Sequence, residues 1–276
     1  MSPTLPTLCG SMAASPHRLA VEMHNAAYRD LGLDYTFVYF GITDPAAGVG
    51  AIRALGIRGM NVSMPFKTAV IPFLDRLDPA ARKIGAVNTI DNRDGVLTGY
   101  NTDYIGALKA LEEQTDLAGS RVALLGAGGA ARAVGYGLAE KSARVTVYNR
   151  SVKPARLLAD EFNLDFGGVL DEFPGCAEFD ILINCTSSGF QSPTVCPLAE
   201  SMLETSLPPD TIVMDVVFLP PQTRLLRLAA SAGCRVVPGA RMLLHQACGQ
   251  VELYTGRQAP VGVMEEVLER EILKMI

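Results

Sequence analysis

Lys67 and Asp103 are the residues of this 276-residue chain whose types most directly suggest chemistry. Lys67 ends the run Gly59-Met60-Asn61-Val62-Ser63-Met64-Pro65-Phe66-Lys67, and Asp103 ends Tyr100-Asn101-Thr102-Asp103. A lysine beside a carboxylate can take a proton from a hydroxyl group and return it. With the dinucleotide-type turn described next, the pair suggests hydride transfer at a carbinol carbon, with a protein group handling the hydroxyl proton.

The glycine-rich turn is Gly126-Ala127-Gly128-Gly129-Ala130, which follows an apolar strand and opens an alanine-rich helix. Small residues let the backbone approach a pyrophosphate, and the helix N-terminus offers unpaired N–H groups and a positive dipole. The spacing departs from strict G-x-G-x-x-G, so a merely tight turn is the alternative. The strand–turn–helix context favours dinucleotide binding.

The residues after the second strand of this region indicate which dinucleotide is bound. Enzymes that use NAD usually carry Asp or Glu there, about 20 residues after the glycines, to bind the ribose hydroxyls. Here the stretch is Tyr148-Asn149-Arg150-Ser151-Val152-Lys153, with two cations and no carboxylate. Arg150 and Lys153 would attract a 2′-phosphate. The pattern favours NADP over NAD, and a solvated loop arginine is the alternative.

Hydrophobic patterns and turn residues predict the elements. In the first part of the chain we expect strands at 36–40 and 59–64, helices at 51–55, 67–77 and 103–113, and a hairpin turn at 92–95. Beyond residue 118 we expect strands at 121–125, 143–149, 180–184, 211–217 and 234–237. Helices are expected at 130–141, at 153–161 and as a pair from 242 onward, and a loop with a short helix at 189–208.

This alternation predicts two α/β domains with a cleft between them. The expected substrate-binding domain is residues 1–103, with C-terminal helices 241–276 packing back on it. The expected NADP-binding domain is residues 104–240, a Rossmann-type doubly wound parallel sheet. Closure of the two domains over their ligands is a further expectation.

Composition and net charge argue against several classes of partner. A net charge of −5 and a pI near 5.3 argue against nucleic acid or an anionic membrane as a partner. No apolar run approaches the roughly 18 residues of a membrane span. Six scattered cysteines without Cys-x-x-Cys, and only three histidines, argue against a metal site. They indicate free thiols in a cytoplasmic protein. A homodimer is possible from the sequence, but no pattern determines it.

Several motifs, in order and spacing, resemble the shikimate/quinate dehydrogenase family. They are Asn61 to Lys67, Gly85-Ala86-Val87-Asn88-Thr89, Asn101-Thr102-Asp103, Gly126 to Ala130, Asn149-Arg150-Ser151 and Thr186-Ser187-Ser188-Gly189. The resemblance implies NADP-linked interconversion of shikimate and 3-dehydroshikimate, in aromatic amino acid biosynthesis or quinate metabolism. Ala54 to Gly59, and Ser63 where the family usually has threonine, resemble a shikimate dehydrogenase-like branch.

The resemblance also implies roles for single residues. Lys67 is the expected base or acid at the substrate hydroxyl, and Asp103 is expected to bind the same hydroxyl. Ser63, Asn88 and Gln246 are expected to hold ring hydroxyls, and Gly239 to lie against the nicotinamide. The full expected cofactor-binding set is Gly126, Ala127, Gly128, Gly129, Ala130, Asn149, Arg150, Lys153, Thr186, Val216 and Gly239.

Two departures from the family concern the substrate carboxylate. The family's Ser-x-Ser-Pro is here Ser11-Met12-Ala13-Ala14-Ser15-Pro16, so either Ser11 or Ser15 is kept and Ala13 replaces the other serine. Phe218 stands where the family usually has tyrosine. Loss of two donors would weaken binding by roughly 30- to 1,000-fold, and Arg18 could compensate. A quinate or aminoshikimate-type dehydrogenase, and a weakly active ligand-binding or regulatory protein, therefore remain alternatives.

Overall fold

The computed structural model describes residues 5–14 and 18–275 and divides into two compact units. Unit 1 is Met1–Thr102 with Gln246–Ile276, and unit 2 is Asp103–His245. The chain therefore passes between the units after Thr102 and again after His245. The sequence expectation placed these two divisions after residues 103 and 240.

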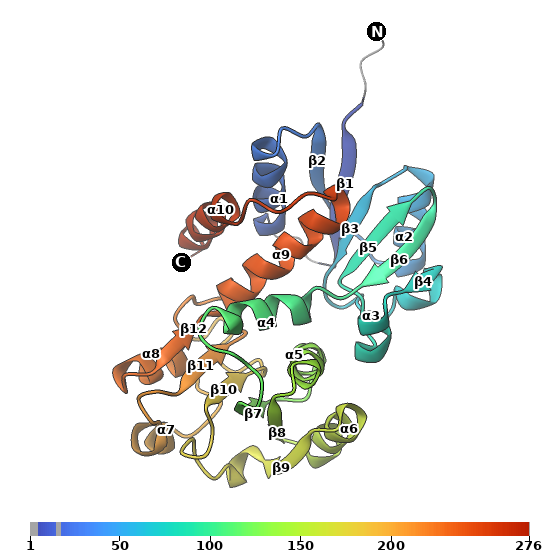
Figure 1. Ribbon diagram of the computed structural model, residues 1–276. Coiled ribbons are helices and arrows are strands. Elements are labelled where there is room, and N and C mark those ends of the chain that lie inside the picture. The colour runs from blue at the N-terminus through green and yellow to red at the C-terminus, as the bar shows by residue number, and fades with distance from the viewer. Residues whose placement is uncertain (1–4, 15–17, 276) are drawn as a thin grey trace. The chain divides into compact units, whose positions relative to one another are not determined.

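Unit 1 contains a mixed six-stranded sheet in the order β2-β1-β3-β5-β6-β4. Strand β1 pairs in parallel with β2 and β3, whereas β3–β5 and β5–β6 are antiparallel. The elements of unit 1 are β1 (Thr7–Ala13), α1 (Leu19–Asp30), β2 (Tyr35–Gly41), α2 (Pro45–Ala54), β3 (Gly59–Val62), η1 (Ile71–Phe73), β4 (Arg76–Leu77), α3 (Pro79–Ile84), β5 (Thr89–Arg93), β6 (Val96–Tyr100), α10 (Val261–Leu273) and the part of α9 (Gly239–Thr255) from Gln246 onward (Figure 1).

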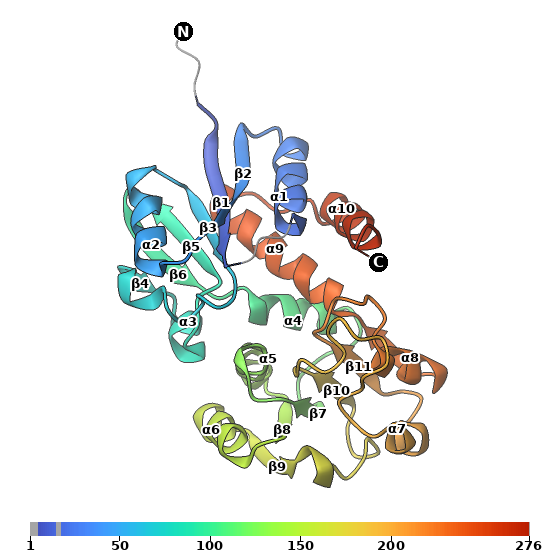
Figure 2. The same cartoon turned by 180° about the vertical axis from the view of Figure 1, so that it is seen from behind.

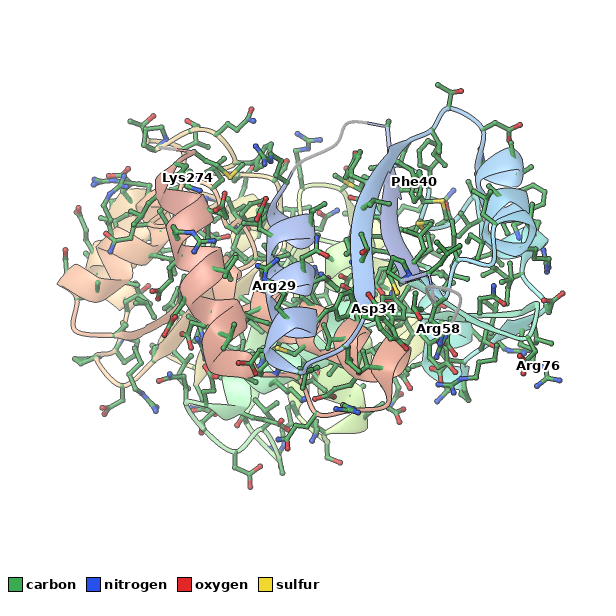
Figure 3. All side chains as sticks on the ribbon, turned by 90° about the horizontal axis from the view of Figure 1, so that it is seen from above. Arg29, Asp34, Phe40, Arg58, Arg76 and Lys274 are labelled. Carbon is green, nitrogen blue, oxygen red and sulfur yellow. The ribbon has the colours of Figure 1, made fainter. Side chains whose placement is uncertain are left out.

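The sheet of unit 1 buries an apolar cluster that includes Val49 and Ile52 of α2, Ala81 of α3 and Met60 and Val62 of β3. Helix α1 lies between β2 and α10, as seen from above in Figure 3. Strand β2 lies at the edge of the sheet, and a side chain of α1 forms hydrogen bonds with its free backbone groups. The Asn25 amide donates to the Phe37 carbonyl and accepts from the Phe37 N–H, both at 2.8 Å, which replaces the hydrogen bonds of a missing neighbouring strand.

Unit 2 contains an all-parallel six-stranded sheet in the order β12-β11-β10-β7-β8-β9, which confirms the predicted Rossmann-type topology. The strand order reverses direction between β7 and β10, the point at which such sheets bind nucleotides. The elements of unit 2 are α4 (Asp103–Glu112), β7 (Arg121–Leu125), α5 (Gly129–Glu140), β8 (Arg144–Asn149), α6 (Val152–Phe162), β9 (Asp165–Val169), η2 (Leu170–Glu172), β10 (Ile181–Asn184), α7 (Glu200–Ser206), β11 (Ile212–Asp215), α8 (Arg224–Ser231), β12 (Arg235–Val237) and the first part of α9 (Figure 2).

Both faces of this parallel sheet are covered, which explains its continuous apolar strands. Within β7, Val122 and Leu124 join one core cluster, whereas Ala123 and Leu125 join another. Helices α4, α5 and α6 contribute to the first cluster, and α7 and α8 contribute to the second. Period-2 alternation thus sends successive side chains of one strand into two separate cores.

The expected helix at 67–77 is wrong. Residues 71–73 form a single 3-10 turn, and Arg76–Leu77 form the short strand β4. Pro72 cannot donate a backbone hydrogen bond and disfavours a helical residue before it, so the helical pattern does not propagate. The expected hairpin turn at 92–95 is confirmed, with positive φ at Asp94 and Gly95 between β5 and β6. Strand β9 was not anticipated.

Candidate functional site

The glycine-rich turn sits at the reversal point of the parallel sheet. Gly126 follows β7 directly and has φ +110°, a conformation that L side chains rarely adopt. A Cβ at Gly126 would lie 3.0 Å from the carbonyl carbon and oxygen of Cys185, at the end of β10. The Gly126 N–H donates to the Tyr148 carbonyl of β8 at 2.7 Å. The first glycine is therefore required by the close approach of three strand ends.

The next two glycines leave room for a ligand. Gly128 is the N-cap of α5, and no side chain within the described ranges caps this helix through a hydrogen bond. A Cβ added at Gly128 or Gly129 would meet nothing within 4 Å. An open helix N-terminus with free space beside it fits a pyrophosphate group, whose charge the helix dipole stabilises.

The loop after β8 carries the two expected phosphate-binding cations. Arg150 and Lys153 are both exposed, and the first turn of α6 contains no acidic residue. The Asn149 amide donates to the Ser151 carbonyl at 2.9 Å and holds the loop at the strand end. The local charge suits a 2′-phosphate better than a free ribose hydroxyl.

A buried carboxylate organises the turns after β10 and β11. Asp215 accepts hydrogen bonds from the Asn184 amide (2.9 Å), the Val217 N–H (3.0 Å) and the Thr223 hydroxyl (2.7 Å). Asn184 in turn accepts from the N–H (3.0 Å) and hydroxyl (2.7 Å) of Thr186. Burial raises the pKa of Asp215 to about 6, although these three donors oppose the shift. Thr186 is thus held in place indirectly by Asp215.

Gly239 begins α9 where the chain leaves β12. A Cβ there would lie 2.6 Å from the Val216 carbonyl oxygen and 2.7 Å from that of Val217. Close backbone packing against the end of β11 therefore requires glycine at this position. Glycine is therefore needed here for packing, separately from the predicted contact of Gly239 with the nicotinamide.

The expected substrate residues of unit 1 lie on or beside neighbouring strands. Ser11 is a buried residue of β1 and stands opposite Asn61 of β3, and Ser63 follows β3. The Ser63 N–H donates to the Met12 carbonyl at 3.0 Å. Lys67 is half-buried, and its carbonyl accepts from the Val87 N–H at 2.8 Å. Ser15 lies outside the described residues.

Asn88 is the centre of the polar cluster in unit 1. Its Oδ1 accepts from the Thr102 N–H (2.7 Å), the Thr89 hydroxyl (2.8 Å) and the Thr102 hydroxyl (3.3 Å). Its Nδ2 donates to Thr102 Oγ1 (3.0 Å) and to Gln246 Oε1 (3.3 Å). The structure thus brings together Asn88 and Gln246, which are 158 residues apart in sequence. Asp103 follows directly on Thr102 and begins α4.

The far end of α4 is also fixed by side chains. Glu113 accepts from Arg241 Nε at 3.0 Å and contacts His245 Nε2 at 2.7 Å, which connects the end of α4 to the first part of α9. Burial alone would raise the pKa of Glu113, but hydrogen bonds from Arg241 and His245 bring it below its usual value. The helix that begins with Asp103 is therefore held at its other end.

Sequence reasoning missed the residues that support Asn88, which include Thr89, Asn61, Gln250 and Tyr254. All four are buried. One sequence signal could have found two of them: Gln246, Gln250 and Tyr254 are four residues apart along one helix and share a face.

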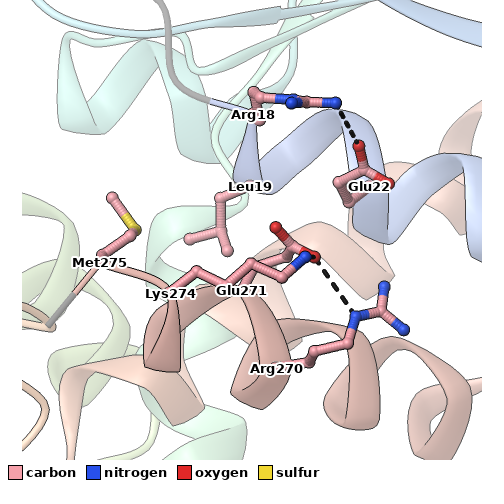
Figure 4. A pocket seen from close by; sticks show the side chains of 7 residues that line it. All are labelled: Arg18, Leu19, Glu22, Arg270, Glu271, Lys274 and Met275. Carbon is pink, nitrogen blue, oxygen red and sulfur yellow. Dashed lines mark hydrogen bonds and ion pairs between the residues drawn. The ribbon is translucent and has the colours of Figure 1, made fainter.

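Arg18 lies on the surface in this structure. Its guanidinium is 3.4 Å from Glu22, and its side chain is 89% exposed. Arg18 borders a surface hollow between the start of α1 and the end of α10, whose other ion pairs are Arg270–Glu271 and Lys274–Glu271 (Figure 4). The pairing with Glu22 gives no support to Arg18 as a carboxylate ligand. Phe218 is half-buried.

The described residues contain neither a metal-binding group nor a membrane-spanning helix. Among the residues placed by the structure, no His, Cys, Asp and Glu side chains form a group that could hold a metal ion. Within the same part of the chain, no helix is long and apolar enough to cross a membrane.

Known proteins resemble this chain over nearly its whole length. Residues 12–90 match the shikimate dehydrogenase substrate binding domain, residues 108–216 match shikimate / quinate 5-dehydrogenase, and residues 239–269 match the shikimate 5′-dehydrogenase C-terminal domain. A relative from Pyrococcus abyssi, named shikimate dehydrogenase (NADP(+)), is 44% identical over 257 residues, covering 92% of this chain and 94% of the relative.

Two solved structures have the same fold. A shikimate dehydrogenase in complex with NADP+ is 33% identical, with a TM-score of 0.89 over 97% of this chain and 96% of that one. The ligand-free 5-ketofructose reductase of Gluconobacter sp. strain CHM43 is 37% identical, with a TM-score of 0.88 over 96% of this chain and 99% of that one. Family models match both parts of the chain, and the Pyrococcus abyssi relative is 44% identical over 92% of it. The chain therefore belongs to the shikimate/quinate dehydrogenase family.

Proposed function

We propose that this protein is an NADP-dependent dehydrogenase that interconverts shikimate and 3-dehydroshikimate. The observation that carries the proposal is the polar cluster around Asn88, which holds Thr102 immediately before Asp103 and contacts Gln246. Such a set of neutral amides and hydroxyls suits the ring hydroxyls of a cyclic polyhydroxy acid. The name of the Pyrococcus abyssi relative supports the same substrate and cofactor.

In the proposed reaction, Lys67 takes the proton of the substrate hydroxyl as the carbinol is oxidised and returns it in the reverse direction. Asp103 accepts a hydrogen bond from the same hydroxyl, and Ser11, Ser63, Asn88 and Gln246 hold the other oxygens. NADP+, when bound, supplies the hydride acceptor. The open N-terminus of α5 would hold its pyrophosphate, and Arg150 and Lys153 its 2′-phosphate.

Replacement of Lys67 tests the proposal most directly. We expect Lys67→Ala to lower kcat for shikimate-dependent NADP+ reduction by about 100- to 10,000-fold, the usual contribution of general acid–base catalysis. The NADPH absorbance of purified protein measures this rate. Lys109→Ala, which removes an exposed lysine of α4, is the matched control. Wild-type turnover in the Lys67 variant would refute its role, and no turnover by the wild type with shikimate or quinate would refute the substrate.

Reduction of a neutral keto-sugar is a second candidate function. The 5-ketofructose reductase is 37% identical to this chain, and Ala13 and Phe218 lack the hydroxyls with which the family is expected to hold a carboxylate. Parallel NADPH oxidation assays with 5-ketofructose and 3-dehydroshikimate distinguish the two. If the acid is the substrate, the Ala13→Ser, Phe218→Tyr double variant should lower its KM without changing activity toward the ketose.

Location and assembly belong to the same proposal. We expect a cytoplasmic location and a homodimer. The cysteines that the structure describes are all free thiols, which suits a reducing compartment. Light scattering of the purified protein at several concentrations measures the oligomeric state, and a constant monomer mass would refute the dimer.

A further inference from the structure

A buried chain of hydrogen bonds in unit 1 runs from the end of α9 to the candidate substrate residues. The Tyr254 hydroxyl donates to Asn61 Oδ1 at 2.6 Å, and Asn61 Nδ2 donates to Gln250 Oε1 at 2.7 Å. Gln250 Nε2 then donates to Thr89 Oγ1 at 3.2 Å. These bonds connect β3, β5 and α9 through uncharged side chains.

The same chain continues to Asn88 and Gln246. The Thr89 hydroxyl donates to Asn88 Oδ1 at 2.8 Å, and Asn88 Nδ2 donates to Gln246 Oε1 at 3.3 Å. Within these five hydrogen bonds every donor points in one direction, from Tyr254 toward Gln246. Asn88 is also held by Thr102, whose N–H donates to Oδ1 at 2.7 Å and whose Oγ1 accepts from Nδ2 at 3.0 Å. In such a chain each hydrogen bond polarises the next, so the orientation of the first group influences the last.

The packing of Tyr254 against β3 fixes the first donor of this hydrogen-bond network. A Cβ at Gly59 would lie 2.2 Å from the Tyr254 ring, so the ring rests directly on the backbone of β3. Gly59 and Asn61 face the same side of the strand, which brings the Tyr254 hydroxyl to Asn61. Gln250 and Gln246 are one and two helical turns before Tyr254 on the same face of α9.

The hydrogen-bonded side chains from Tyr254 to Gln246 are all uncharged, and burial keeps Tyr254 protonated. The side chains from Tyr254 to Asn88 are all buried, and burial raises the pKa of Tyr254 well above its usual value. The nearby His24 is fully buried and has its pKa lowered to about 4 for the same reason, so it too stays neutral near pH 7. The direction of the donors is consequently not reversed by ionisation of Tyr254 or His24 near pH 7.

We propose that Tyr254, Asn61 and Gln250 are positioning residues for the candidate substrate site. Together with the Thr102 N–H they orient the Asn88 amide, which donates to the Gln246 oxygen and leaves Gln246 Nε2 as the group offered to the substrate. The site thereby recognises a substrate oxygen as an acceptor. The identity of that substrate rests on the proposed function, whereas the hydrogen-bond chain does not.

Two substitutions at Gln250 test the chain kinetically. Gln250→Met keeps the side-chain length and cuts the chain, and Gln250→Glu replaces the donor to Thr89 with an acceptor, which draws the Thr89 hydroxyl away from Asn88. We expect each to raise the KM for shikimate by about 10-fold, the equivalent of one hydrogen bond to the ligand. The KM for NADP+ and the shape of the pH–rate profile should not change.

Matched variants separate positioning from general destabilisation. Thr255→Val removes a hydroxyl of the same helix that donates to the Val251 carbonyl at 2.7 Å and is not part of the hydrogen-bond network. This variant should keep wild-type kinetics. Tyr254→Phe removes only the first donor and should raise the KM by a smaller factor in the same direction. A lower melting temperature in the Gln250 variants with an unchanged KM would overturn the proposal.

A spectroscopic measurement tests the chain without turnover. The side-chain NH2 signals of Asn88 and Gln246 in a 1H–15N spectrum can be assigned from the Asn88→Asp and Gln246→Glu variants. Tyr254→Phe should shift the Asn88 signals through four hydrogen bonds, whereas Thr255→Val should not. Unmoved Asn88 signals would overturn the proposal. If the wild type is inactive but Tyr254→Phe still shifts the Asn88 signals, the proposed function is refuted and the hydrogen-bond network is supported.

Discussion

The two units contain buried polar networks of opposite kinds beside their candidate ligand sites. In unit 1, a one-way chain of amides and hydroxyls ends at Asn88 and Gln246, and none of its members is charged. In unit 2, the network centres on Asp215, a carboxylate that burial brings to a pKa of about 6. The first network should hold its geometry at any moderate pH, and the second should respond to pH.

The two sites also differ in what they present to a ligand. The candidate cofactor site presents backbone N–H groups at the open N-terminus of α5, after a glycine with positive φ. The candidate substrate site presents side chains from β1, from Asn88 just before β5 and from α9, segments that are distant in sequence. A backbone site depends on local conformation, whereas a side-chain site depends on the packing of several elements.

The largest effect that we expect from this difference is a pH-dependent stability controlled by Asp215. Because its folded pKa is raised above the ordinary value of 3.8, its contribution to the free energy of unfolding is complete below pH 3.8 and is lost as the pH rises through about 6. The difference between 3.8 and about 6 corresponds to about 3 kcal/mol. Asp215→Asn should therefore gain stability relative to wild type, by up to that amount, between pH 4 and pH 7 in urea unfolding.

Asp180 supplies a control of opposite sign for this measurement. Hydrogen bonds from Arg121 lower the pKa of Asp180, so its contribution is present at neutral pH and is lost as the pH falls. Asp180→Asn should lose stability relative to wild type as the pH rises through the acid range. If the difference in unfolding free energy between Asp215→Asn and wild type did not change between pH 4 and pH 7, the two networks would not differ in their response to pH.

The next largest effect concerns the two kinds of glycine in the cofactor turn. Gly126→Ala introduces backbone strain and a contact with Cys185, and should destabilise the protein by about 1–3 kcal/mol while weakening NADP+ binding. Gly129→Ala places its Cβ in open space and should weaken NADP+ binding without lowering the melting temperature. Calorimetry and thermal unfolding measure the two properties. Equal melting temperatures for the two variants would contradict the distinction.

The smallest effect should come from the exposed cations after β8. Arg150→Ala should reduce NADP+ affinity by about 10-fold, or about 1.4 kcal/mol, through loss of a charge-assisted contact with the 2′-phosphate. NAD+ affinity should stay the same, because NAD+ lacks that phosphate. Lys141→Ala, which removes an exposed lysine elsewhere in unit 2, is the control. A parallel loss of NAD+ affinity would show that Arg150 only supports the loop.

Local sequence was most informative in unit 2. The apolar run of β7, the turn at Gly126 and the cations at Arg150 and Lys153 are contiguous signals, and the parallel sheet follows from alternating strands and helices. The strand β9 was missed because Asp165–Val169 contains two glycines and only two apolar β-formers. In unit 1, the helical pattern of residues 67–77 misled, since Pro72 and the pairing of β4 with β6 outweigh helix periodicity there.

Residue types and motif order thus determined the family, the Rossmann-type sheet and the candidate pair Lys67 and Asp103, because these signals are carried by short contiguous segments. Only the tertiary structure decided how Asn88 and Gln246 are supported. Asn61 lies far from Gln250 and Tyr254 in sequence, and the three become one network because α9 packs on β3 and β5. Hydrogen-bond direction is a property of assembled neighbours, and it cannot be read from any one segment of the chain.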